Sequence, residues 1–521
     1  MISNTSKPST RENDSSIQPL PFSKFLAGFK KTLKSAFHIN SSIDELSLQR
    51  GLPPHVLNEI MSYNPLSICI PKQYGGRGAP VYQCIAVMSE ASYESLALSL
   101  ALSINYALFI QPVIKYGQSE VKAPIFNRFL FERNMGGLMI TEPEHGSDAL
   151  NMQTSFSEQN GYYHIQGRKH WGGLTGMANF WLLAARKHIE DRIARDIDFF
   201  ICDVNSPGQE IIVEEYYQSL GLYLIPYGLN RIDVHVPQLQ RLIPKTSGIQ
   251  MMLDILHRNR VQFPGMGMGF IKRMLDEAIV HSQQRKVGNK PLSSYDQVQQ
   301  RLARLQANYT ICSVLCTIGS ELADLNNDLA PLGLEANIIK CITTDIMQEA
   351  SQSTLQLFGA KGFRLNHIAG RGTIDSRPFQ IFEGSNDILY LQISDTFLKL
   401  MYAAGKNNFL MFLKGFHLTA RATGYLKDIL NFDLKKQLPQ RKLVELGQII
   451  SRIAAMDYVI KIGDRGFRPD LINGALSMLR QEIITLVSTY ACPQSSIVIE
   501  EYEENSFWLN FVNEKPVHSQ T

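Results

Sequence analysis

Apolar residues recur every three or four positions along most of the chain, a spacing that predicts a mainly helical protein. The first apolar stripe has four members: Phe25, Phe29, Leu33 and Phe37. Lysines lie on the other sides of the same stretch. We interpret residues 23–37 as a helix that docks its apolar side on the body of the protein. Contact with an anionic membrane surface is the alternative, which we do not favour.

Two further helical regions follow, one starting near Pro53 and one from Val81 to Phe131 with a break near Gln118. Residues 95–114 carry no charge and have the length of a membrane span. Four polar residues interrupt this run: Ser99, Ser103, Asn105 and Gln111. We therefore interpret the run as a buried core helix rather than a transmembrane helix.

The pattern changes at Gly136, where runs rich in β-branched and aromatic residues begin. Four of these runs cover residues 162–166, 180–185, 198–202 and 232–236. Turn sequences such as Asn160-Gly161 separate them. The runs predict a small β-domain between two helical parts.

Long helical periods return after residue 247 and predict an antiparallel bundle. Their ranges are 249–258, 269–285, 295–325, 335–358 and 388–405. Three more helices are expected over residues 409–426, 434–462 and 471–491, before a polar end that frays. The predicted fold class is α+β, mainly α. The predicted domains are a disordered tail (1–22), an N-terminal helical domain (23–135), a middle β-barrel-like domain (136–245), a four-helix bundle domain (246–405) and a C-terminal helical extension (406–521).

Composition narrows the function classes. The chain has 521 residues and a formal net charge of +3, without the concentrated basic tract that nucleic-acid binding requires. Its seven cysteines are scattered and form no Cys-x-x-Cys pair, which suits a reducing compartment and neither a disulfide framework nor a zinc site. The first twenty residues lack the pattern of a secretory signal. We therefore expect a cytoplasmic protein without a bound metal.

One stretch, residues 377–388, sets a single carboxylate among apolar side chains. The neighbours of Glu383 include Phe379, Ile381 and Phe382. Burial beside them would disfavour the charged form of Glu383 and raise its pKa toward the range of a general base. Gly384 would let a ligand approach the backbone closely. The alternative is an ordinary helix start, in which Glu383 and Asp387 lie in the first turn.

Three other stretches accompany this one: Thr141-Glu-Pro-Glu-His-Gly-Ser147-Asp148, Gly167-Arg-Lys-His-Trp171 and Gln356-Leu-Phe-Gly359-Ala-Lys-Gly362-Phe363. Together with Ile381-Phe-Glu-Gly-Ser385 they resemble the patterns T-E-P-x-x-G-S-D, G-x-K-x-W, Q-x-x-G-x-x-G-F and I-Y-E-G-T of the acyl-CoA dehydrogenase family. The order and the spacing also agree. The resemblance covers residues 22–405 and matches the layout of helical part, β-domain and bundle.

The resemblance implies that the protein binds FAD in the cleft between the β-domain and the bundle. It implies oxidation of an acyl-CoA thioester across its α and β carbons, with Glu383 as the base for the α-proton and flavin N5 as the hydride acceptor. The implied FAD contacts are Leu138, Met139, Ile140, Thr141, Ser147, Trp171, Gly173, Arg285, Gln356, Gly359, Ala360, Ser385 and Asp387. The implied substrate contacts are Ser147, Arg260 and Gly384.

Four of these residues imply an oligomer. By resemblance, Arg285 pairs with the FAD pyrophosphate of a neighbouring subunit, and Gln356, Gly359 and Ala360 lie against the adenosine half of that FAD. We therefore expect a homo-oligomer whose cofactor site is completed by a second chain. In larger relatives a C-terminal extension occupies the face on which two dimers would meet, so we favour a homodimer over a tetramer.

Two departures from the family pattern concern the chemistry. Trp171 is followed by Gly172 and Gly173, so the side-chain hydroxyl that the family places near flavin N5 is missing. His257 stands three residues before Arg260, where the family commonly has an acidic residue. These changes affect flavin N5 and the CoA end, so the pattern supports the fold and FAD binding more firmly than the substrate.

The leading hypothesis is an acyl-CoA dehydrogenase that passes electrons to an electron-transfer flavoprotein. A flavin oxidase or hydroxylase on the same fold is an alternative, which the glycine pair after Trp171 would favour. A largely non-catalytic, nucleic-acid-associated flavoprotein of the adaptive-response type is another, but acidic residues intersperse the basic positions of residues 427–442. The motifs leave open the length and branching of the acyl chain and the choice between CoA and a carrier protein.

Overall fold

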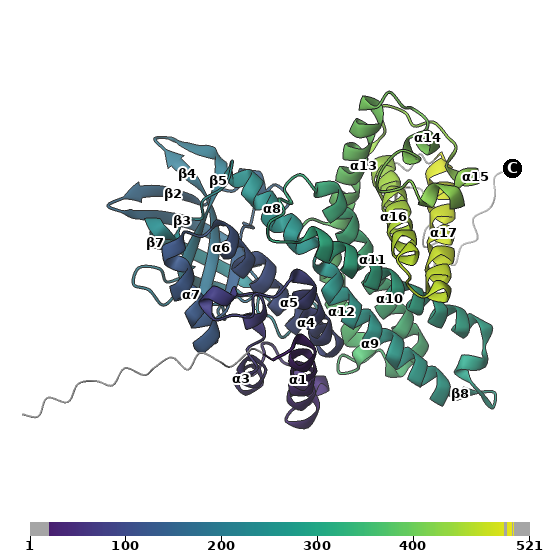
Figure 1. Ribbon diagram of the computed structural model, residues 1–521, viewed down its shortest axis with the longest axis horizontal. Coiled ribbons are helices and arrows are strands. Elements are labelled where there is room, and N and C mark those ends of the chain that lie inside the picture. Colours follow the sequence, from purple (N-terminus) through teal and green to yellow (C-terminus); the bar gives the residue numbers. More distant parts are fainter. Residues whose placement is uncertain (1–19, 494–497, 503, 505–521) are drawn as a thin grey trace, which may run out of the picture.

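The computed structural model describes residues 20–493, 498–502 and 504. The predicted disordered tail therefore lies outside the described residues except for residues 20–22. Most of the predicted fraying end also lies outside them. The molecule is elongated, with a sheet at one end of its long axis and the C-terminal helices at the other (Figure 1).

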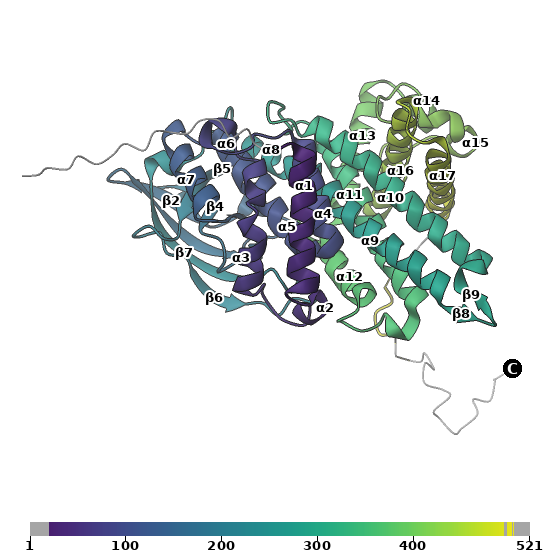
Figure 2. The ribbon, with the colours of Figure 1, turned by 60° about the horizontal axis from the view of Figure 1, so that its bottom comes forward.

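The N-terminal region is helical, as expected. Its α-helices are α1 (Phe22–Lys34), α2 (Ile43–Leu46), α3 (Pro54–Ser62), α4 (Val81–Glu94), α5 (Leu96–Ser103), α6 (Gln111–Tyr116) and α7 (Ser119–Phe131). All four residues of the first apolar stripe are buried. Helix α1 packs along α4 (Figure 2), so the prediction that it docks on the body of the protein is confirmed.

The uncharged run forms one continuous helical stretch, because α5 passes through a π-helical segment, η4 (Ile104–Ile110), into α6. By length and composition alone, residues 96–116 could cross a membrane. However, 89% of the 18-residue apolar segment within this stretch is buried inside the protein. The prediction of a buried core helix is thus confirmed. Helical segments of the π type occur often at functional sites, and η4 follows Ser103, a residue that reaches the candidate site.

The middle region is a curled sheet of seven strands. The strands are β1 (Gly136–Met139), β2 (Ser155–Gln159), β3 (Tyr162–His170), β4 (Phe180–Ile189), β5 (Arg192–Asp203), β6 (Ile212–Tyr216) and β7 (Gly228–Pro237). Their order is β1-β4-β2-β3-β7-β6, with β5 on β4. The parallel pairing of β1 with β4 leaves the residues after Met139 at one end of the sheet, beside the end of β3.

Six helices follow the sheet: α8 (Gly248–Arg260), α9 (Phe263–Gln284), α10 (Asp296–Leu322), α11 (Gly333–Phe358), α12 (Ile368–Ser376) and α13 (Asn386–Ala403). A two-stranded hairpin, β8 (Lys286–Val287) and β9 (Lys290–Pro291), joins α9 to α10. The long helices agree with the predicted bundle. Helix α12 was not predicted from the sequence.

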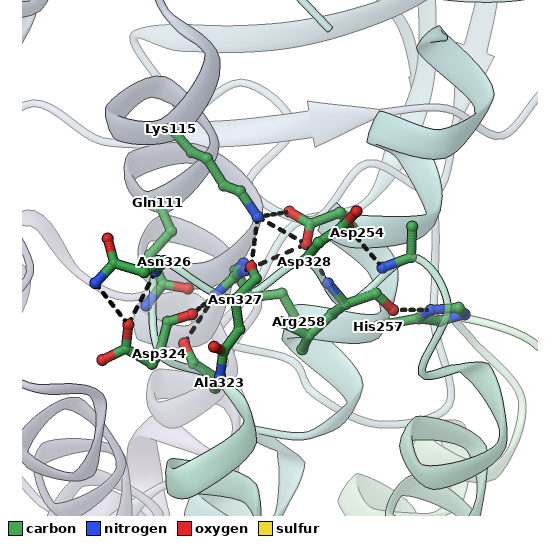
Figure 3. Close-up of polar contacts among 12 residues, drawn as sticks. Gln111, Lys115, Asp254, His257, Arg258, Ala323, Asp324, Asn326, Asn327 and Asp328 are labelled. Atoms are coloured by element: carbon green, nitrogen blue, oxygen red, sulfur yellow. Dashed lines mark hydrogen bonds and ion pairs between the residues drawn. The ribbon is translucent and has the colours of Figure 1, made fainter. Parts of the chain in front are cut away.

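A buried polar cluster fixes the start of this region (Figure 3). The Lys115 ammonium on α6 donates to Asp254 Oδ1 on α8 at 2.9 Å and to the Asn327 carbonyl at 2.7 Å. Arg258, one turn along α8, donates to Asp254 Oδ1 at 3.2 Å and to the Ala323 carbonyl at 2.7 Å. The cluster therefore ties α6 and α8 to the loop between α10 and α11.

The extension beyond α13 contains α14 (Phe409–Leu413), α15 (Lys427–Leu430), α16 (Gln440–Asp464) and α17 (Pro469–Ala491). The predicted helix over residues 409–426 is wrong, because only α14 and a 3-10 turn, η10 (Ala422–Tyr425), form there. Gly415 and Gly424 weaken the helix, and the Asp457 carboxylate of α16 accepts from the backbone N–H groups of Arg421 and Ala422 in its place. Helix α16 packs on α13, and α17 packs on α10. The predicted fold class is confirmed.

Candidate functional site

The Glu383 loop lies between the 3-10 turn η9 (Arg377–Gln380) and helix α13. Glu383 and Gly384 both have left-handed backbone conformations, with φ values of 54° and 90°. A Cβ added to Gly384 would lie 2.9 Å from Leu389 Cδ2, so the positive φ and this contact together favour glycine there. Because α13 begins at Asn386, Glu383 precedes the helix, and only Asp387 occupies its first turn. A strained residue of this kind is typical of functional sites.

The Glu383 carboxylate is only partly satisfied. Its Oε1 accepts from the Asn259 side-chain amide, whereas its buried Oε2 has no hydrogen-bond partner among the described residues. Burial raises the pKa of Glu383 to about 7, although Arg260 and the Asn259 hydrogen bond act in the opposite direction. The expected direction of the pKa shift is confirmed. Ile381, one of the neighbours expected to bury Glu383, is itself 56% exposed.

The amide of Asn259 is itself held in place. Ser103, at the end of α5, donates its hydroxyl to Asn259 Oδ1 at 2.9 Å. An amide that accepts with its oxygen directs its nitrogen to the other partner. Ser103 therefore orients Asn259 so that its N–H group points to Glu383 Oε1.

Two buried cations hold the backbone of the loop. Arg260 Nε donates to the Glu383 carbonyl at 3.1 Å, and its Nη1 donates to Asn337 Oδ1 at 2.8 Å. Lys340 Nζ donates to the Gly384 carbonyl at 2.9 Å and to Asn386 Oδ1 at 2.8 Å. Burial lowers the pKa of Lys340 to about 8. The two cations thus fix the backbone carbonyls of the loop, whereas the Glu383 carboxylate accepts from Asn259.

The structure gives Arg260 and His257 contacts that were not predicted from the sequence. Arg260 is 8% exposed and bound to the Glu383 loop, so its contact with CoA stays a prediction. The buried His257 ring places Nδ1 at 2.8 Å from the Leu329 carbonyl. Burial and the nearby Arg260 charge lower the pKa of His257 to about 4. His257 is therefore a neutral core residue that packs on the start of α11.

Two of the sequence motifs meet in a buried ion pair at the end of the sheet. The Lys169 ammonium donates to Glu142 Oε1 at 2.9 Å and to the Ile140 carbonyl at 2.8 Å. The backbone N–H groups of Gln153 and Thr154 also donate to the Glu142 carboxylate. Burial would raise the pKa of Glu142, but Lys169 and these donors hold it below its ordinary value. The glutamate of one motif and the lysine of the other therefore fix the two segments side by side.

This ion pair positions the predicted flavin contacts of the sheet. The His170 N–H donates to the Thr141 carbonyl at 3.0 Å, so Thr141 lies next to the segment that carries Trp171. Trp171 has a φ of 55°, is 51% exposed and lies against Tyr217 with 4.7 Å between ring centroids. Leu138 and Met139 end β1, Ile140 follows them, Gly173 is half-buried and Ser147 is exposed in the loop beyond Thr141.

Four of the remaining predicted FAD contacts form a second group far from the sheet. Arg285 ends α9 at the β8–β9 hairpin, at the opposite end of the molecule in Figures 1 and 2. Gln356, Gly359 and Ala360 are exposed at the end of α11. The His281 and Phe358 rings stack at 4.1 Å and join the two helix ends. Within one chain, the structure thus separates the predicted site residues into two groups, while Ser385 and Asp387 stay beside Glu383.

Both groups fit FAD in the chemistry of their side chains. At the sheet, the exposed indole of Trp171 and the neighbouring Thr141 offer an aromatic surface and a hydroxyl to a planar ring. At the bundle end, the exposed Arg285 guanidinium offers the fork of donors that suits phosphate oxygens. A Cβ added to Gly359 would meet no atom within 4 Å, so the backbone there is open to close approach.

Sequence reasoning missed Asn259, Lys340 and Ser103. Asn259 directly precedes Arg260, and its amide could have been considered with that residue. Lys340 gives a signal, because it is a single charge in the apolar run Ile338-Ile-Lys-Cys-Ile342. Ser103 gives none, since it appeared only as a polar interruption of a long apolar run.

Known proteins resemble this chain in sequence and fold. It is 26% identical over 370 residues to an acyl-CoA dehydrogenase of Bacillus subtilis, covering 70% of this chain and 93% of that protein. It is 24% identical over 357 residues to the caffeyl-CoA reductase-Etf complex subunit CarC of Acetobacterium woodii, covering 68% and 93%. A solved structure of an acyl-CoA dehydrogenase complexed with FAD from Bacillus anthracis superposes with a TM-score of 0.73 at 17% identity, covering 91% of this chain and 88% of that one.

Three domain families account for most of the chain. Residues 36–130 match the acyl-CoA dehydrogenase N-terminal domain, residues 137–230 the middle domain and residues 246–398 the C-terminal domain. These matches follow the observed order of helical region, sheet and bundle. The chain therefore belongs to the acyl-CoA dehydrogenase family of FAD-dependent oxidoreductases.

Proposed function

We propose that this protein dehydrogenates an acyl-CoA thioester between its α and β carbons, with Glu383 as the base that removes the α-proton. One observation carries the proposal: within the described part of the chain, Glu383 Oε2 is buried and accepts no hydrogen bond. The Glu383 pKa of about 7 suits a general base, because such a base is ionised near neutral pH and still holds a proton well.

The residues around Glu383 have separate roles in the proposed reaction. FAD, when bound, supplies the acceptor for the β-hydrogen, which leaves as hydride. Asn259 holds Oε1, so the α-proton passes to Oε2. Arg260 and Lys340 fix the carbonyls of Glu383 and Gly384. This fixed backbone would present the Glu383 N–H to the thioester carbonyl, as the family resemblance implies. The hydrogen bond would polarise that carbonyl, which is bonded to the α-carbon.

The two separated groups of FAD contacts support a shared cofactor site. We propose that the Thr141 and Trp171 end of one chain binds the flavin, while Arg285 and Gln356 of a second chain bind the pyrophosphate and adenosine. The extension packs α16 on α13 and α17 on α10, and we propose that it occupies the face on which two dimers would otherwise meet. The proposed assembly is a homodimer, located in the cytoplasm.

Two candidate functions differ in their electron acceptor. An electron-transfer flavoprotein is the leading acceptor, and the name of the Acetobacterium woodii relative refers to an Etf complex. The glycine pair favours an oxidase or hydroxylase as the second candidate. A Cβ on Gly173 would lie 2.7 Å from Ile104 Cδ1, so a hydroxyl-bearing residue there would require the Ile104 side chain to move.

Anaerobic reduction of the bound flavin tests the reaction. We expect at least one saturated straight-chain acyl-CoA to bleach the yellow protein. The matched control is a 2,2-dimethylacyl-CoA, which has no α-proton and should leave the colour unchanged. Admitting oxygen afterwards separates the two candidates, since rapid recovery of colour would indicate an oxidase. Bleaching by dithionite but by no acyl thioester of CoA or a carrier protein would contradict the proposed function.

Sedimentation equilibrium of the FAD-loaded protein tests the assembly. A dimer is the expected species. A stable tetramer would reject the role given to the extension, and a monomer that retains FAD would reject the shared site.

A further inference from the structure

The carboxylate of Asp345 on α11 links the C-terminal extension to the Glu383 loop. Asp345 Oδ1 accepts from the Gln380 side-chain amide at 2.8 Å and from the Asn386 side-chain amide at 2.8 Å. These two residues lie three positions before and three positions after Glu383. One oxygen atom therefore holds both sides of the loop.

The second oxygen of Asp345 faces the extension. It accepts from the Tyr390 hydroxyl of α13 at 2.5 Å and from Arg452 Nη2 of α16 at 2.7 Å. Arg452 Nη1 also donates to the Tyr390 hydroxyl at 2.5 Å. Arg452 belongs to the extension, which lies beyond the residues matched to the C-terminal domain of the family.

The ion pair of Asp345 and Arg452 is largely buried, with side-chain exposures of 19% and 13%, and each residue compensates the charge of the other. Burial would raise the pKa of Asp345, but the Arg452 charge and the hydrogen bonds from Tyr390, Arg452 and Gln380 together keep the pKa below its ordinary value. An ionised carboxylate only accepts hydrogen bonds, which suits the four donors around Asp345. Removing one partner of a buried ion pair leaves an uncompensated charge and is strongly disruptive.

Further ion pairs anchor Arg452 away from the loop. Its Nε lies 3.5 Å from Glu482 Oε2 on α17. Arg304 of α10 donates to Glu482 Oε1 at 2.6 Å and also pairs with Glu349. Arg304 does not appear among the partners of Asp345 in the described residues, so it shares the cluster without touching the carboxylate that holds the loop.

We propose that the C-terminal extension positions the Glu383 loop, because Arg452 anchors Asp345 and Asp345 in turn fixes Gln380 and Asn386 on both sides of Glu383. Arg452 and Asp345 are positioning residues, since neither contacts Glu383 itself. The catalytic consequence rests on the proposed function of Glu383 as a base. The mechanical consequence, an ordered loop, does not.

Hydrogen–deuterium exchange of the intact FAD-loaded protein tests the ordering directly. In Arg452→Met, we expect the backbone amides of residues 379–388 to exchange about tenfold faster than in the wild type, because loss of Arg452 loosens Asp345. Arg304→Met is the matched control, since it removes a second arginine of the same cluster and should leave loop exchange unchanged. Arg452→Lys should restore part of the protection. Tyr390→Phe, which keeps Arg452, should give a smaller acceleration and covers the case in which Arg452→Met does not fold.

Flavin reduction by the best acyl-CoA gives the second readout. In Arg452→Met, we expect the limiting reduction rate to fall about tenfold, with a much smaller change in the acyl-CoA concentration at half-saturation. Unchanged loop exchange in Arg452→Met and Tyr390→Phe, or equal acceleration in Arg304→Met, would overturn the proposal. Faster loop exchange without a slower reduction rate would support the positioning and count instead against Glu383 as the base.

Discussion

Asp254, on helix α8, and Glu383, which contacts α8, are two carboxylates that differ in how their oxygens are used. Asp254 accepts from Lys115, Tyr116, Arg258 and the Leu329 N–H. Among the described residues, the Glu383 carboxylate accepts only from Asn259. The cations near Glu383 donate to the backbone carbonyls of Glu383 and Gly384 and not to the carboxylate.

The difference appears in the two pKa values. Burial would raise the pKa of Asp254, but Arg258, Lys115 and the Leu329 N–H hold it below its ordinary value. Burial dominates at Glu383 and raises its pKa to about 7. A carboxylate whose lone pairs are occupied stabilises the fold, whereas one with an oxygen left over can take up a proton.

Of the variants that test this difference, Glu383→Gln should have the largest effect, which is on the rate of flavin reduction. The amide keeps the shape of the side chain but has no basic oxygen, so the rate of flavin reduction by acyl-CoA should fall by about 10²–10⁴-fold. The protein should remain folded and yellow. A variant that keeps full turnover would place the base on another residue.

Asp254→Asn should instead affect stability. It leaves the buried charges of Lys115 and Arg258 without their carboxylate, and breaking a buried pair costs roughly 3–5 kcal/mol. Urea denaturation measures the free energy of unfolding. The rate of flavin reduction per folded molecule should stay near that of the wild type, and a loss as large as that of Glu383→Gln would remove the distinction between the two carboxylates.

Asn259→Leu should make Glu383 a weaker acid. The variant removes the hydrogen bond that favours the charged form, so the pKa of Glu383 should rise by about one to two units, given roughly 1.5–3 kcal/mol for a hydrogen bond to a charged group. The acidic limb of the pH–rate profile reports this pKa. Ser103→Ala is the milder companion, since it only frees the amide to turn, and it should shift the limb less. A limb that does not move in Asn259→Leu would show that Asn259 does not tune the base.

The smallest effect concerns stability against pH. Because the folded pKa of Glu383 is above its ordinary value of 4.5, the neutral form is favoured by folding. The stability linked to Glu383 is therefore fully present below pH 4.5 and declines as the pH rises to about 7. Glu383→Gln lacks this titration. The melting temperature of the variant minus that of the wild type should therefore increase as the pH rises from 5 to 8. A constant difference would indicate an unshifted carboxylate.

The main helices and the sheet could be predicted because their apolar residues repeat at regular intervals. The stripe from Phe25 to Phe37 and the long bundle helices follow directly from that spacing. The region after Phe409 could not be predicted, because Asp457, distant in the sequence, replaces the hydrogen bonds of a helix there. Helix α12 is short and carries glycines at residues 370 and 372, which weaken the helical signal.

Some residues of the candidate site could likewise be predicted from the sequence, and others could not. Glu383 and the glycine turn after it were evident from one local stretch. Asn259, Lys340 and Asp345 were not, because each comes from a different part of the chain and no sequence spacing connects it to Glu383. The packing of α8 and α11 around the loop brings them together.

The pH dependence of flavin reduction tests the central claim most directly. Stopped-flow mixing of the anaerobic wild-type protein with its best acyl-CoA would give the reduction rate from pH 5 to 9. If Glu383 is the buried base described here, the rate should rise with pH through a single acidic limb with a midpoint near 7. A limb near pH 4.5, or a rate that does not change across this range, would contradict it.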